Sequence, residues 1–153
     1  MNNKKKIILG VILFCLFVIG SCKKEPEQSC GTCPVGGSVN STPGFSYVKN
    51  NGATVTADSA FFIPVSKTIV AYYQGYAHKV NIKTASLAAG TYSFTSSANT
   101  LSYVEATFTY IASGGSINIT SNTNSKLSGN FVSNGSGGGI TSLTGQFTDI
   151  PSK

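Results

Sequence analysis

Apolar and polar side chains alternate with a period of two along most of residues 44–153. In residues 78–83, for example, Val80 and Ile82 share one face, and residues 116–120 repeat the scheme. Such alternation is typical of strands with one buried and one solvated face. We therefore expect an all-β domain over residues 44–153: an antiparallel β-sandwich of about seven to nine strands, with an open β-barrel as the alternative.

Further patterns refine the strand prediction. The alternation continues through residues 91–95 and through residues 104–110, and each stretch is predicted as one strand. Asn51-Gly52 separates two short runs around Tyr47 and Val55 and predicts a hairpin turn, since this dipeptide favours tight turns between strands.

A short internal repeat is the most specific pattern. Residues 127–131 and 143–147 both read L-[ST]-G-[NQ]-F, and the glycine-rich residues 133–139 lie between them. We expect two successive antiparallel strands with the leucine, glycine and phenylalanine directed inward. Gly129 and Gly145 are predicted to allow a bulge or to leave room for a neighbouring ring.

The N-terminus has the pattern of an export signal. Residues 4–6 are lysines, and the apolar run at 7–19 would reach roughly 20 Å as a helix, short of the roughly 30 Å needed to cross a membrane. Residues 1–21 are therefore predicted as a signal peptide. The run ends in Ile19-Gly20-Ser21-Cys22, which resembles the bacterial lipobox.

This resemblance implies cleavage before Cys22 and lipidation of its sulfur. Cys15 is a poorer candidate, because the bulky Phe14 precedes it where the lipobox has a small residue. Two or three acyl chains hold a protein on a bilayer. We therefore expect Cys22 to anchor the chain to the membrane.

Residues 22–43 are predicted as a flexible tether, because they are rich in proline, charge and small polar residues. Cys30 and Cys33 form an even pair in an oxidising compartment, so a local disulfide or idle thiols are expected. A metal site and a redox motif are the alternatives. Pro34 argues against a helix that would activate a thiol.

Charge composition argues against nucleic-acid binding. The chain has 11 lysines, no arginine and five acidic residues, and removal of residues 1–21 leaves a formal charge of +3. Phosphate recognition depends strongly on arginine and on clustered basic charge. The Lys-Lys-Glu after Cys22 partly resembles the signal that exports some Bacteroidota lipoproteins, so we expect an outer-membrane location with exposure at the cell surface. A solvated spacer on a domain that faces the periplasm is the alternative.

Catalytic chemistry has few candidates. His78 is the only histidine and is expected as a half-buried residue at the rim of the sheet rather than as a base. Asp58, Glu105 and Asp149 are the acids of residues 44–153. We predict no enzyme activity, catalytic residue, cofactor or metal. The alternative is an envelope hydrolase that uses His78 or paired carboxylates.

Two surface features are candidates for recognition or modification. Tyr72, Tyr73 and Tyr76 flank Gln74, and aromatic rings beside amides can stack on sugars. The alternative is a strand end with one ring in the core and two packed on a loop. Asp58-Ser59-Ala60 resembles the O-glycosylation acceptor of exported Bacteroidota proteins, which makes Ser59 a candidate glycosylation site.

The stretches ADSAFF, LAAGTYSF, GGSINITSN, LSGNF and ITSLTGQFTDIP together resemble a family of Bacteroidota lipoproteins of uncharacterised function. The likeness covers about residues 45–151, and GTY, G-x-I-x-I-T and SG-x-F are its better markers. The resemblance implies a β-rich envelope lipoprotein and transfers no catalytic residue. We expect a lipid-anchored protein with a non-catalytic β domain that binds a glycan or an envelope protein, or serves a structural role.

Overall fold

The computed structural model describes residues 44–153, which contain ten strands and no helix. The predicted signal peptide and tether, with Cys22, Cys30 and Cys33, lie outside the described residues, so those assignments stay predictions. The strands are β1 (Gly44–Lys49), β2 (Thr54–Thr56), β3 (Ser59–Ile63), β4 (Thr68–Tyr73), β5 (His78–Lys83), β6 (Gly90–Ser93), β7 (Thr100–Glu105), β8 (Phe108–Thr123), β9 (Lys126–Gly137) and β10 (Ile140–Pro151).

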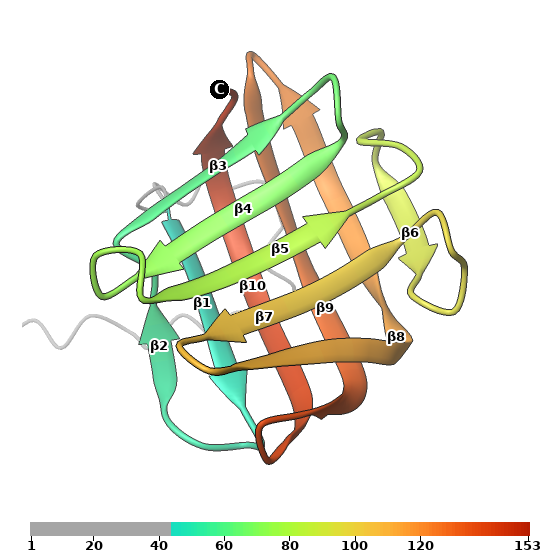
Figure 1. The fold of residues 1–153 in the computed structure, drawn as a ribbon. Helices are drawn as coiled ribbons and strands as arrows, with labels where there is room; N and C mark the ends of the chain where they lie inside the picture. The colour runs from blue at the N-terminus through green and yellow to red at the C-terminus, as the bar shows by residue number, and fades with distance from the viewer. Residues whose placement is uncertain (1–43) are drawn as a thin grey trace, which may run out of the picture. The chain divides into compact units, whose positions relative to one another are not determined.

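All ten strands belong to one antiparallel sheet in the order β2-β1-β10-β9-β8-β7-β5-β4-β3, with β6 paired to β8. The sheet curls so that β3, β4, β5 and β7, the front half-sheet, cross over β1, β2, β9 and β10, the back half-sheet (Figure 1). The all-β, antiparallel prediction is confirmed. The two facing layers come from one half-barrel-like sheet, and ten strands exceed the expected seven to nine.

The long strand β8 joins the two half-sheets. Its first residues pair with β7, and after a register shift between Ala112 and Gly114 its later residues pair with β6. Gly115 lies at this point with φ of 96°, and a Cβ there would collide with the carbonyl oxygen of Val132. Only glycine accepts both constraints, so Gly115 lets β8 turn from one layer into the other.

The edge strand β3 meets the residues that follow β10. Phe62 forms an isolated parallel bridge with Ser152, and the Lys153 N–H donates to the Phe62 carbonyl at 2.9 Å. These contacts place Lys153 beside β3, on the front half-sheet.

Aromatic side chains from both half-sheets fill the space between the layers. The ring of Phe45 on β1 stacks on Phe131 at 5.7 Å and on Phe147 at 6.1 Å between centroids. Tyr103 and Tyr110 are fully buried. Burial of each such side chain stabilises the fold by about 1.5–3 kcal/mol, so this core accounts for the curl of the sheet.

The internal repeat forms the successive antiparallel strands that the sequence predicts. In β9 and β10, Gly145 pairs with Phe131 and Gly129 pairs with Phe147. A Cβ on either glycine would lie 2.6 Å from the ring of its partner phenylalanine. Each phenylalanine therefore covers the glycine opposite it, and the prediction that these glycines leave room for a ring is confirmed.

Residues 104–110 were predicted as one strand, and this prediction is wrong. β7 ends at Glu105 and β8 begins at Phe108, with these two residues paired across a turn. Ala106 in this turn has φ of 39°. The turn contains no glycine, proline or asparagine to signal it, and its two residues leave the period of two intact.

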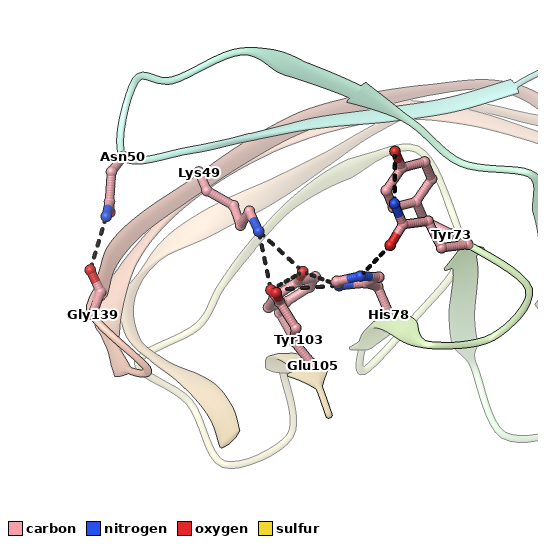
Figure 2. A network of polar contacts seen from close by, with 8 residues as sticks. Lys49, Asn50, Tyr73, His78, Tyr103, Glu105 and Gly139 are labelled. Atoms are coloured by element: carbon pink, nitrogen blue, oxygen red, sulfur yellow. Dashed lines mark hydrogen bonds and ion pairs between the residues drawn. The ribbon is translucent and has the colours of Figure 1, made fainter. Parts of the chain in front are cut away.

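The predicted hairpin is present, with β1 and β2 paired on either side of Asn51-Gly52. Asn50 and Asn51, with φ of 50° and 58°, supply the left-handed residues of the turn. The Asn50 side chain also fixes the neighbouring turn, because its Nδ2 donates to the Gly139 carbonyl at 2.9 Å (Figure 2).

Candidate functional site

His78 lies at the start of β5 on the face that it shares with Val80 and Ile82, as the alternation predicts. This face points between the layers, at the corner where β1 and β7 end. The side chain is 14 % exposed. The ring Nδ1 lies 2.7 Å from the Tyr103 hydroxyl, and Nε2 lies 2.9 Å from Gln74 Oε1.

Further polar groups from inner faces meet His78 at this corner (Figure 2). The Tyr103 hydroxyl donates to Glu105 Oε2 at 2.6 Å. Lys49 Nζ donates to the same carboxylate oxygen at 3.0 Å and to the Tyr103 hydroxyl at 3.3 Å. The Gln74 Nε2 donates to the Tyr73 hydroxyl at 3.5 Å. We call Lys49, Tyr73, Gln74, His78, Tyr103 and Glu105 the corner network.

The corner network lowers the pKa of Glu105 and raises the pKa of Tyr103. The hydrogen bond from Tyr103 lowers the pKa of the Glu105 carboxyl below its ordinary value, and Lys49 adds to this effect. Burial raises the pKa of the Tyr103 hydroxyl above its ordinary value, and its hydrogen bond to Glu105 acts in the same direction. Glu105 is therefore a carboxylate and Tyr103 a neutral phenol at neutral pH.

Hydrogen-bond directions then follow for His78. Because the Tyr103 proton is donated to Glu105, the Tyr103 oxygen accepts from His78 Nδ1. The imidazolium form also donates to Gln74. The neutral ring, with one N–H, satisfies both partners only if the Gln74 amide presents its NH2 group.

The polar groups of the corner network mostly satisfy one another's hydrogen-bonding capacity. Both nitrogens of His78 have partners within the network, and the hydroxyl beside them belongs to a phenol whose burial disfavours ionisation. Elsewhere in the described chain, Asp58 Oδ2 accepts from the Gly75 N–H at 3.3 Å, and Asp149 Oδ1 accepts from the Ser128 hydroxyl at 3.3 Å. Asp58, Glu105 and Asp149 thus have different partners on different elements.

The corner network itself connects three strands, β1, β5 and β7, where they meet at the corner.

The three candidate tyrosines do not form one cluster. Tyr73 faces inward with its ring centroid 5.5 Å from that of His78, while Tyr72 faces outward on the other side of β4. Tyr76, in the β4–β5 turn, packs edge-on against Tyr72 at 4.6 Å between centroids. The period of two separates Tyr72 from Tyr73.

Phe61 on β3 extends the outward pair. Its ring centroid lies 6.2 Å from that of Tyr72, and Val70 on the same outer face is only 4 % exposed. Tyr76 is 72 % exposed. We call Phe61, Tyr72 and Tyr76 the outer patch: its rings present apolar surface to solvent on the front half-sheet.

Two lysines flank the outer patch. Lys79 Nζ lies 5.8 Å from the centroid of Tyr72, and Lys153 Nζ lies 4.5 Å from that of Phe61. Both distances suit cation–π attraction. The patch therefore combines ring surface with positive charge.

Ser59, the candidate glycosylation site, is exposed at the start of β3 and pairs with Tyr72 across the strands. A hollow of about 120 Å³ lies beside it, lined by Asp58, Ser59 and Ala60 among others. The acceptor sequence is thus accessible and lies next to the outer patch.

A shallow groove of about 370 Å³ lies on the back half-sheet. Asn130, Gln146 and Thr144 line it together with Val132, and none of its lining residues is charged. Three of the four polar positions of the repeat therefore face this groove, and the fourth, Ser128, does not. The aromatic rings of the outer patch lie on the other half-sheet.

Sequence reasoning missed Tyr103 as a partner of His78, and Lys49 as a partner of Glu105. The pairing of β5 with β7 places His78 opposite Glu105, and the curl of the sheet adds Lys49 from a strand 56 residues away from Glu105. The alternation gave the face of each strand, but no local pattern specified which strands meet.

Comparisons with family models, with curated proteins and with solved structures gave no match to this chain. Within residues 44–153, no three histidine, cysteine, aspartate or glutamate side chains group closely enough to hold a metal ion. The same residues contain no helix with the length and apolar character needed to cross a membrane.

Proposed function

We propose that this chain is a lipid-anchored protein of the cell envelope whose β domain binds glycans through the outer patch. Support for the anchor comes from the sequence Ile19-Gly20-Ser21-Cys22 after an apolar run. The outer membrane, with the domain displayed at the surface, is the proposed location, and an envelope protein is the alternative ligand.

The observation that carries the binding proposal is the exposure of Tyr76. Tyr76 is 72 % exposed, and its ring packs edge-on against that of Tyr72, which leaves ring surface accessible to a ligand. Sugar rings present apolar C–H faces that stack on such surfaces. Contiguous apolar surface of this kind, rather than a single exposed side chain, is what often marks an interaction site.

A glycan array tests the binding proposal. We expect the wild-type chain to bind a subset of glycans and Tyr76→Ala to lose that binding. Val132→Ala is the control, because Val132 is 59 % exposed but lies on the back half-sheet. A silent array, or equal binding by both variants, would remove the outer patch as the binding site.

Fractionation tests the anchor. We expect Cys22→Ala to move from the membrane fraction to the soluble fraction and to lose the mass of its acyl groups, because two or more acyl chains are needed for stable attachment. Retention of the variant in the membrane fraction would contradict the proposed anchor without bearing on the glycan site.

A further inference from the structure

The charged side chains of residues 44–153 divide unequally between the two half-sheets. Six lysines and three acids lie in these residues. Lys49 pairs with Glu105 at 3.0 Å, and Lys126 pairs with Asp149 at 3.8 Å. Within each ion pair the lysine and the carboxylate neutralise each other's charge. Neither pair involves the outer patch.

The remaining charged residues all lie on the front half-sheet, in its turns or, for Lys153, directly beside it. They are four lysines against one acid, a surplus of three positive charges: Lys67, Lys79, Lys83 and Lys153 against Asp58. The net positive charge of the domain is therefore concentrated on the half-sheet that carries the outer patch.

Two of these lysines are held close to the rings. Lys79 on β5 pairs directly across the strands with Tyr72 and lies over its ring. Lys153 lies over the ring of Phe61 and is held there by its backbone bond to Phe62. One ammonium group thus lies over each of two neighbouring rings of the outer patch.

The opposing acid is already engaged. Asp58 Oδ2 accepts the Gly75 N–H at 3.3 Å, in the turn that presents Tyr76. Its charge lies at one end of the patch and leaves Lys79 and Lys153 without a carboxylate partner among the described residues. A ligand carboxylate would supply that partner.

We infer that the outer patch selects acidic glycans, in which a sugar ring stacks on Tyr76 and a uronate carboxylate pairs with Lys79 or Lys153. This inference rests on the proposed function. Because the chain has no arginine, the positive charge beside the outer patch comes from lysines, whose ammonium groups are point charges that can pair with a carboxylate.

Calorimetric titration of the full chain in detergent micelles tests the inference. The probes are oligogalacturonate, its neutral methyl ester and polyglutamate, which carries carboxylates without sugar rings. We expect oligogalacturonate to bind at least about tenfold more tightly than either comparison probe, with an affinity that falls as salt is added.

Variants assign the effect to residues. We expect Lys79→Gln to weaken binding of oligogalacturonate about tenfold, since hydrogen bonds between charged groups are the stronger class. Lys126→Gln is the matched control, because Lys126 is paired with Asp149 away from the patch. Tyr76→Ala should weaken binding of the acid and leave the fold intact.

The possible results separate the two proposals. Equal binding of the acid and its methyl ester, both lost in Tyr76→Ala, would keep glycan binding and overturn the acidic preference. Equal binding of polyglutamate, unaffected by Tyr76→Ala, would show attraction by charge alone and overturn the inference. Absence of binding to both sugars would count against the acidic preference and the proposed function together.

Discussion

The corner network and the outer patch both combine tyrosine rings with a nearby lysine, but with opposite outcomes. Tyr72 and Tyr73 are neighbours in sequence, yet Tyr72 belongs to the outer patch and Tyr73 to the corner network. In the corner network, Lys49, Tyr103 and Glu105 satisfy one another at 2.6 to 3.3 Å. In the outer patch, Tyr76 is 72 % exposed.

The difference teaches which of the two regions has capacity for a ligand. Polar groups that are buried must find partners, and the corner network provides them within the chain. The outer patch leaves ring surface and ammonium groups open to solvent. The corner network therefore contributes to stability, and the outer patch is the region that we propose for recognition.

The largest expected effect is on the buried centre of the corner network. Tyr103→Ala should destabilise the fold by about 3–5 kcal/mol, as large aromatic deletions in cores do. Tyr103→Phe should cost about 1–3 kcal/mol, since Glu105 and His78 each lose a hydrogen-bond partner. Chemical denaturation measures both. A Tyr103→Phe variant with unchanged stability and weakened glycan binding would reverse the roles that we assign to the two regions.

A second prediction concerns pH. The pKa of Glu105 is lowered in the folded chain from its ordinary value of 4.5, chiefly by the Tyr103 hydrogen bond. The contribution of the carboxylate to stability is therefore fully present above about pH 4.5 and is lost as the pH falls through the folded pKa.

Glu105→Gln checks this expectation. We expect the difference in free energy of unfolding between wild type and variant to shrink as the pH falls below 4.5. Denaturation curves at several pH values give the difference. A gap that widens in acid would contradict the lowered pKa.

A smaller effect on stability is expected at the outer patch. Tyr76→Ala should change the free energy of unfolding by less than about 0.5 kcal/mol, because surface substitutions seldom do more. The same variant should lose most of its glycan binding. A loss of stability comparable to that of Tyr103→Phe would mean that Tyr76 is a structural residue.

The smallest effect is expected at Ser59. Ser59→Ala should leave stability unchanged, because the side chain is exposed. We expect the intact mass of the wild-type protein from its native host to exceed the sequence mass by an O-glycan that the variant lacks. Equal mass differences in both proteins would remove Ser59 as the glycosylation site.

Local features of the sequence predicted much of the fold. The period of two gave the inner faces of β5, β9 and β10, and Asn51-Gly52 gave the first hairpin. The repeat gave the pairing of β9 with β10 and the rings over Gly129 and Gly145. These features depend on neighbours in sequence or on a short hairpin, which a single sequence can report.

Long-range pairing could not be predicted in the same way. β1 pairs with β10 near the other end of the chain, and Lys49 reaches Glu105 only because the sheet curls. The outer patch likewise needs Lys153 beside Phe61. The β7–β8 turn was missed because Ala106-Thr107 carries no turn signal. Such contacts follow from packing of the whole domain.

The central claim, that a ligand meets the outer patch and leaves the corner network untouched, is tested most directly by mapping amide chemical shifts of the full chain during titration with oligogalacturonate. The predicted result is shifts centred on Phe61, Tyr72, Tyr76 and Lys79. Shifts centred on His78, Tyr103 and Glu105, with Tyr76 unmoved at saturation, would contradict it.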